Sequence, residues 1–414
     1  MGAEVGEVVR KNALVTTTTT NASMPPVGWV REVPPNGLRS RPEASLYADN
    51  DNPSGLATPE NELETTPEHR NLAMGDPACA SWTRAYDDPN VVAYRQFLAA
   101  NNGIRGLDIV EPHEVERATR LFHRDGFVVV RDALSPEQTA RLRAATDRQL
   151  GRILATDPQA AVGGGAGGLP HRYSFGSSSG SRHMLHEREW CELIDLPTTT
   201  PILTSIFGSA DYLVLGGGGD VALPGAIEYQ GLHSDNLWSE LPDPTGQVSI
   251  RDLPVPVLTI NFTVCDLTTE NGPIRQVPGT QRSRQPIPTL ADEPIWMKLS
   301  TLCPIPAGCA VFRDNRCWHG GTPNLSRETR AIPNIEYFAP WFRSEALIKS
   351  MPYERWAELS PHAQRISRFV AAYPGETILG AGFVDPRGAE RERFKAEQLA
   401  SLSPDQAAEV LARR

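Results

Sequence analysis

The fold is decided by residues 257–264, VLTINFTV, and by similar segments before and after them. From about residue 211 to residue 342, short apolar stretches alternate with turns rich in Gly, Pro, Asn and Asp. Short stretches between closely spaced turns are typical of an antiparallel sandwich or barrel. The other stretches are YLVL (212–215), IRQVP (274–278), CAVFR (309–313) and AIPNIEYF (331–338). The sequence therefore predicts a β core in this region.

Helices are predicted on both sides of the β core. Residues 111–126, EPHEVERATRLFHRDG, place apolar side chains at helical spacing, and FVVVR (127–131) follows as a buried strand. Ser135 and Gln138 form a capping box around Pro-Glu, which opens the next helix. Helical patterns return after residue 342. The predicted fold class is mainly β with flanking helices.

Composition divides the chain into three parts. Residues 1–75 are rich in Pro, Thr, Asn and Glu without periodicity, which predicts a low-complexity extension that is disordered or wraps the domain. Residues 76–342 form the candidate catalytic domain, and residues 343–414 form a helical extension. Two glycine-rich stretches interrupt the domain. We expect 163–181 to be a loop or lid, and GGGG at 216–219 to be a turn.

Composition also limits the partners. The 414-residue chain has a formal net charge of −10 and a pI near 5.5, which argues against a broad nucleic-acid or anionic membrane surface. Because the sequence has neither a membrane-spanning apolar run nor the apolar core of a signal peptide, we expect a cytoplasmic protein. The six cysteines show no CxxC spacing, so neither a zinc site nor a disulfide framework is indicated. The sequence does not predict the oligomeric state.

A histidine and an aspartate lie two residues apart in GLHSDNLW (231–238). The preceding GAIEYQ (225–230) is predicted to be a strand that runs into the pair, so His233 and Asp235 would share one face. Two histidines and one carboxylate on one face of an octahedron are a known site for Fe(II) in oxygenases. A single H-x-D pattern also arises by chance in a chain of this composition, so the pair needs support from elsewhere.

That support lies between residues 309 and 330. His319 follows a predicted strand and a turn, and it is the candidate second histidine. Arg330 lies at the start of the apolar stretch AIPNIEYF, where a buried guanidinium suits bidentate binding of a carboxylate. Such a cation would anchor the far end of a dicarboxylate co-substrate. Arg327 is the rival, but its position in the turn NLSRET favours exposure to solvent.

Together these motifs resemble the phytanoyl-CoA dioxygenase family of Fe(II)- and 2-oxoglutarate-dependent oxygenases. The resemblance covers about residues 112–342. It rests on Gln230-x-x-His233-x-Asp235, on NGPIRQVPGT (271–280), on His319 followed by Arg330, and on the opening HRDGFVVVRDALSPEQ (123–138). The sequence departs from the family at Thr280-Gln281, where Ser-His is usual. We expect this departure to change the packing around the site rather than the ligands.

The resemblance implies a double-stranded β-helix, a jelly-roll or cupin-like core, in which His233, Asp235 and His319 bind Fe(II). It also implies 2-oxoglutarate and O₂ as co-substrates. The expected reaction is hydroxylation of an aliphatic C–H bond of a small molecule, with release of succinate and CO₂. Halogenases of the family have Ala or Gly where this chain has Asp235. The carboxylate therefore favours hydroxylation or a related oxidation such as desaturation, cyclisation or epimerisation.

The resemblance also suggests residues that contact the co-substrate. Arg330 would bind the distal carboxylate of 2-oxoglutarate, with Asn261 and Gln230 as further contacts. We expect Arg182 or His183, in a lid over the site, to meet a polar group of the substrate. The acidic net charge favours a natural product over an acyl-CoA thioester as substrate. The alternatives are an acyl-CoA oxygenase, a metal-binding cupin-like protein with another activity, and a purely structural or interaction protein.

Overall fold

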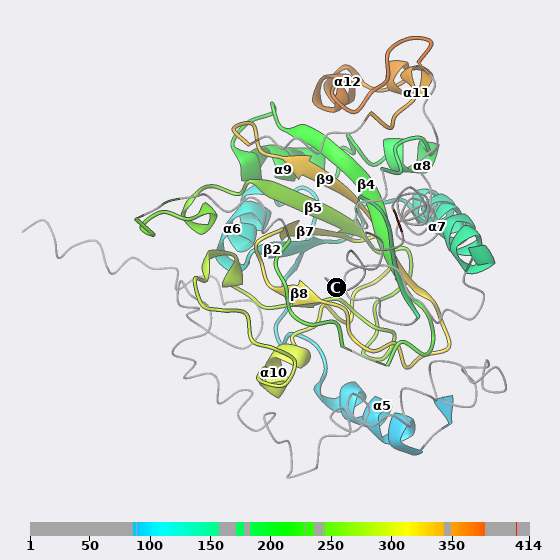
Figure 1. Cartoon of the computed structure of the whole chain (residues 1–414), viewed down its shortest axis with the longest axis vertical. Coiled ribbons are helices and arrows are strands. Elements are labelled where there is room, and N and C mark those ends of the chain that lie inside the picture. The colour runs from blue at the N-terminus through cyan, green and yellow to red at the C-terminus, as the bar shows by residue number, and fades with distance from the viewer. Residues whose placement is uncertain are drawn as a thin grey trace, which may run out of the picture.

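The computed structural model describes most of the chain between residues 86 and 376 (Figure 1). The described residues are 86–156, 171–177, 183–235, 243, 245–342, 349–376 and 403, except Asp88 and Glu228. The predicted N-terminal extension (1–75) and much of the predicted C-terminal extension (343–414) lie outside them. No helix among the described residues is long and apolar enough to cross a membrane.

A seven-stranded sheet forms the larger half of the core, with the strand order β1-β2-β7-β5-β9-β4-β3. Only the β1–β2 pair is parallel, and the other neighbouring strands are antiparallel. The apolar stretch quoted first became the central strand β5, as predicted. The strands are Ile109–Val110 (β1), Phe127–Val130 (β2), Arg172–Gly176 (β3), Leu213–Ala222 (β4), Val257–Phe262 (β5), Ala310–Asp314 (β7) and Arg330–Phe338 (β9).

A much shorter second sheet faces the large one. It consists of β6 (Arg275–Gln276) and β8 (His319–Gly320), and isolated bridges extend it. The bridges join His233 to His319, Asn271 to Asn324, and Arg275 to Thr301. Pro and Gly are frequent in this half of the barrel and interrupt the ladder, so its strands stay short. The two sheets form a double-stranded β-helix with flanking helices, which confirms the predicted fold class (Figure 1).

Helices lie around the two sheets (Figure 1). Helices α6, α7 and α12 contact strands of the large sheet, with α9 beside α6 and α8 beside α7, whereas α10 contacts β6 in the second sheet. Two short helices, α11 and α12, follow β9. The bounds are Pro89–Asn101 (α5), Val115–Asp125 (α6), Pro136–Thr156 (α7), Arg188–Cys191 (α8), Thr200–Phe207 (α9), Ile295–Lys298 (α10), Tyr353–Ala357 (α11) and Pro361–Ser367 (α12).

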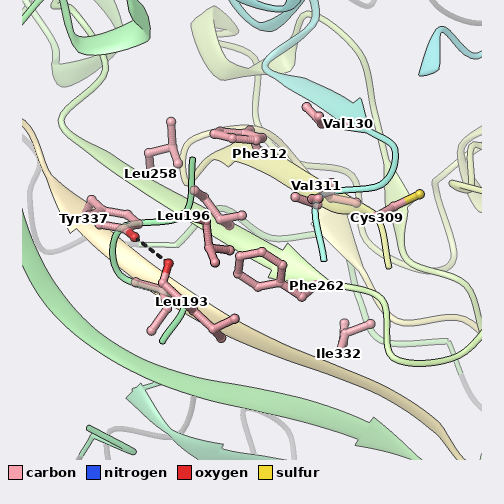
Figure 2. Packing of buried hydrophobic residues seen from close by; sticks show 14 of the residues in the cluster. Val130, Leu193, Leu196, Leu258, Phe262, Cys309, Val311, Phe312, Ile332 and Tyr337 are labelled. Atoms are coloured by element: carbon pink, nitrogen blue, oxygen red, sulfur yellow. Dashed lines mark hydrogen bonds between the residues drawn. The ribbon is translucent and has the colours of Figure 1, made fainter. Parts of the chain in front are cut away.

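The main hydrophobic core lies between the helices and the outer face of the large sheet. Figure 2 shows Leu193 and Leu196, from the segment after α8, close to Phe262 and Tyr337 on the strands. The Tyr337 hydroxyl donates a hydrogen bond of 3.0 Å to the carbonyl of Ile194. Because successive side chains of a strand point to opposite faces, the neighbours of these outward residues point into the barrel. The interior wall of the site is built in this way.

Two local predictions are confirmed. Helix α6 ends at Gly126, whose φ of 84° lies in the left-handed region that favours glycine at a helix end. At the start of α7, the Gln138 amide donates to the Ser135 hydroxyl at 3.2 Å, and the Ser135 amide donates to the Gln138 side chain at 2.9 Å. These reciprocal bonds are the predicted capping box.

Two predictions for glycine-rich segments are wrong. Part of the expected loop 163–181 is the edge strand β3, whose Tyr173 and Phe175 are buried. The expected turn at 216–219 is the middle of β4. Glycines are needed there because neighbours come very close. A Cβ at Gly219, for example, would lie 2.6 Å from the ring of Phe175. The glycines thus serve tertiary packing rather than a turn.

Candidate metal centre

Three side chains with metal-binding atoms converge between the two sheets: His233, Asp235 and His319. One ligand atom from each lies within 4.8 Å of the others. The predicted strand before His233 is wrong, because Pro224-Gly225 forms a turn and the residues after it form a loop. Isolated backbone hydrogen bonds to the segment around His319 hold this loop in place. His233 and His319 exchange a pair of N–H···O bonds, each of 3.0 Å, which places the two imidazoles side by side.

Backbone carbonyls orient both imidazole rings. The Nδ1 atom of His233 lies 3.0 Å from the carbonyl of Gly231, and that of His319 lies 2.9 Å from the carbonyl of Cys317. A carbonyl only accepts, so each Nδ1 carries the proton and each Nε2 keeps a free lone pair. The Nε2 atoms lie 3.7 Å and 3.4 Å from the carboxylate of Asp235. Metal-binding histidines usually donate the other ring N–H to a carbonyl or carboxylate in this way, so the residues fit a metal ion.

The charges of the three side chains also suit a divalent cation. Burial alone would raise the pKa of Asp235, but His319, Arg313 and His233 outweigh it and hold that pKa below its ordinary value. Burial, followed by the positive charge of Arg313, lowers the pKa of His319 to about 4. Asp235 is therefore ionised and His319 neutral near neutral pH. Both are then in the state that binds a metal, without the loss of a proton.

Arg313 contacts the candidate centre but was not among the residues predicted from the sequence. It lies in β7, its side chain is 9% exposed, and its Nη2 donates a hydrogen bond of 2.8 Å to Oδ2 of Asp235. A guanidinium fixed in this way restricts the orientation of the carboxylate between the two histidines. Its signal in the sequence was weak, since it is one charged residue at the end of an apolar run.

Replacing Arg313 with lysine is expected to lower the affinity for Fe(II) by about tenfold. Lysine keeps the positive charge, so repulsion of the ion is unchanged, but it lacks the planar fork that orients Asp235. Loss of an outer-shell partner typically costs about 10–100-fold in metal affinity. Competition with a chelator of known affinity measures the effect. Equal affinity in the wild type and the variant would show that Arg313 does not position the carboxylate.

Arg330 begins β9 and is 3% exposed. Its Nε donates a hydrogen bond of 2.8 Å to the carbonyl of Gly272, in the turn of the NGPI segment. None of the described carboxylates forms an ion pair with it. A buried guanidinium without a counter-ion is costly, and a bound carboxylate would offset that cost. Arg327, the rival, is 54% exposed and lies over the ring of Tyr86.

The remaining candidate residues differ in their surroundings. Asn261 is buried in β5 opposite Asn334 of β9, and its neighbours Ile260 and Phe262 pack toward the helices, so Asn261 faces the interior. The Gln230 side chain accepts a bond of 3.0 Å from the Gly321 amide, which fastens the loop before His233 to the segment after His319. His183 is buried, whereas Arg182 lies outside the described residues.

The departure from the family pattern at Thr280-Gln281 affects packing next to the site. The Thr280 hydroxyl accepts a hydrogen bond of 2.8 Å from the backbone amide of Trp318, the residue before His319. The Gln281 side chain donates at 3.2 Å to the carbonyl of His123, at the end of α6. Neither residue is among the three that converge at the centre.

The fold and the donor set define a double-stranded β-helix protein with a candidate metal centre of two histidines and one carboxylate. The family model described as phytanoyl-CoA dioxygenase (PhyH) matches residues 122–332, more than half of the chain. The chain belongs to this family. Its cofactors are those of the family, Fe(II), 2-oxoglutarate and O₂.

Solved structures that are similar to this chain include two enzymes of nogalamycin biosynthesis. The non-haem α-ketoglutarate-dependent epimerase SnoN from nogalamycin biosynthesis is 20% identical, with a TM-score of 0.42 over 55% of this chain and 81% of that chain. The carbocyclase SnoK from the same biosynthesis is 21% identical, with a TM-score of 0.40 over 56% and 87%. HygX from Streptomyces hygroscopicus, with nickel, 2-oxoglutarate and hygromycin B bound, is 15% identical, with a TM-score of 0.39 over 55% and 88%.

Proposed function

We propose that this protein is an Fe(II)- and 2-oxoglutarate-dependent dioxygenase that hydroxylates an aliphatic C–H bond of a small molecule of specialised metabolism. The observation that carries the proposal is the combination of the converged triad with a buried arginine that forms no direct ion pair with the described carboxylates, Asp220 acting on it only from a longer distance. The triad suits Fe(II), and Arg330 suits the far carboxylate of a dicarboxylate co-substrate. The retained carboxylate of Asp235 supports hydroxylation, since it fills the position that a halide would need.

In this proposal each residue has a distinct task. The Nε2 atoms of His233 and His319 and the carboxylate of Asp235 bind the ion. Arg330 holds the distal carboxylate of 2-oxoglutarate, and Asn261 offers an amide to the co-substrate from the same interior wall. When bound, Fe(II) supplies the activation of O₂ that couples decarboxylation of 2-oxoglutarate to oxidation of the substrate.

An anaerobic titration of the full chain with Fe(II) and 2-oxoglutarate tests the proposal. We expect a weak visible charge-transfer band that requires both components, and release of succinate when O₂ and a substrate are added. The substrate panel should include acyl-CoA thioesters beside amine- and hydroxyl-bearing natural products, because turnover of a thioester would replace the proposed substrate class. If the folded protein binds the metal and shows no band, it is a cupin-like protein with another activity.

A further inference from the structure

The interior wall of the large sheet carries polar residues that the metal and the co-substrate leave unused. One row crosses four strands: Gly216 of β4 pairs with Glu336 of β9, Glu336 with Thr259 of β5, and Thr259 with Arg313 of β7. Directly opposed residues on one face have neighbouring side chains. The row therefore runs from the arginine that contacts Asp235, over Thr259 and Glu336, to a glycine.

His183 occupies the space over that glycine. A Cβ on Gly216 would lie 1.7 Å from Nδ1 of His183, so only glycine leaves room for the imidazole beside Glu336. His183 is 5% exposed, and neither of its ring nitrogens has a hydrogen-bond partner in the part of the chain that the structure describes. Burial lowers the pKa of His183 to about 4, so the ring is neutral near pH 7. Unsatisfied buried nitrogens are costly, which indicates that a ligand bonds to them.

Glu336 is the second unusual group of this wall. No ion pair joins it to a cation among the described residues. Its side chain stays half-buried although it projects from β9 into the barrel. Burial and the charge of Asp235 raise the pKa of Glu336 to about 7, because the charge of Arg313 and a hydrogen bond with Ser177 offset them only in part.

A third carboxylate adds to the negative charge of the wall. Asp220, on the same face of β4, accepts a hydrogen bond of 2.5 Å from Ser174 of β3. With the centre loaded, the dianionic co-substrate and Asp235 leave one positive charge of those on Fe(II), Arg313 and Arg330 uncancelled. Ionised Asp220 and Glu336 reverse it, so the barrel carries one excess negative charge when both are carboxylates. A cation is the ligand that balances it.

We propose that Glu336 and His183 form a binding site for a basic nitrogen of the substrate, an amine that binds as an ammonium group. The ammonium donates hydrogen bonds to the Glu336 carboxylate and to a ring nitrogen of His183, and Asp220 adds long-range attraction. Glu336 lies two strands from Arg313, about 10 Å across the sheet, so a small molecule reaches from this site to the metal centre. The inference rests on the proposed function and specifies its substrate class.

Three matched probes test the inference: cyclohexylamine, cyclohexanol and cyclohexanecarboxylate. Their binding to the full chain, loaded anaerobically with Fe(II) and 2-oxoglutarate, is measured by ligand-observed NMR in the wild type and in Glu336→Gln. Glu354→Gln, in the exposed first turn of α11, is the control. We expect the amine to bind the wild type and the control at least about tenfold more tightly than the other two probes, as charge-assisted hydrogen bonds require. Glu336→Gln should lose this preference and keep the charge-transfer band.

The outcomes separate the two proposals. A band without any preference for the amine, or with binding of none of the probes, overturns the inference and leaves the proposed function intact. A preference that survives Glu336→Gln overturns it as well. An amine preference without a band overturns the proposed function and retains the cation site. Glutamine nearly matches the shape of glutamate, and the retained band reports that the variant is folded.

Discussion

Replacing His319 with alanine is expected to remove metal binding and all 2-oxoglutarate turnover. His319 supplies one of the three candidate ligand atoms, and its side chain is buried, with only 7% exposed. Loss of an outer-shell partner alone costs about 10–100-fold in affinity, so loss of a ligand should cost at least about 100-fold. Titration with Co(II), followed by its visible absorption, measures metal binding without O₂ chemistry, and succinate release measures turnover.

His362→Ala is the matched control for this variant. His362 lies on α12, where its Nε2 is 3.0 Å from the hydroxyl of Tyr212, outside the barrel. The control should bind Co(II) as the wild type does. Thermal unfolding of the metal-free proteins shows whether His319→Ala is folded. A folded His319→Ala variant that binds Co(II) with wild-type affinity would place the metal elsewhere and contradict the proposed centre.

Elements that depend only on residues close together in the sequence were predicted well. Helix α6 and the capping box of α7 need only apolar spacing and local hydrogen bonds. The sequence predicted the start of β4 (YLVL, 212–215) but not its glycine stretch, because these glycines pack against residues far away in the sequence, among them His183 and Phe175. The segment before His233 was wrongly assigned to a strand, since its backbone bonds to residues 321 and 324 at isolated points rather than in a continuous ladder. Long-range contacts of this kind leave no local pattern.

The same distinction applies to the site. Residue type and spacing pointed to His233, Asp235 and His319, which converge in the structure, and to Arg330 as a candidate, although the strand invoked to align the first two is absent. Arg313 and the interior carboxylates were not identified. Whether a charged residue in an apolar strand faces the barrel or the helices depends on the pairing register. The sequence did contain one signal that polar side chains share a face of this strand: Asn334 and Glu336 alternate with apolar residues in AIPNIEYF.

Replacing Arg330 with glutamine is expected to weaken 2-oxoglutarate binding by about 100-fold or more and to leave metal affinity nearly unchanged. Truncating one partner of a buried charge pair costs about 2–5 kcal/mol, much of it from the unpaired charge that remains. Glutamine can still donate to the Gly272 carbonyl, so the local fold should persist. Titration of the Fe(II) protein with 2-oxoglutarate, followed by the charge-transfer band, gives the affinity, and Co(II) absorption gives the metal affinity.

Two further variants determine whether the effect comes from the position and the geometry of the guanidinium. Arg327→Gln removes an exposed arginine three residues away and should bind 2-oxoglutarate like the wild type. Arg330→Lys keeps the charge without the bidentate fork, so its affinity should fall between those of the wild type and Arg330→Gln. If Arg330→Gln binds 2-oxoglutarate normally, the buried cation serves the fold alone. The alternative of a metal-binding cupin-like protein, which lacks this co-substrate site, then describes the chain better.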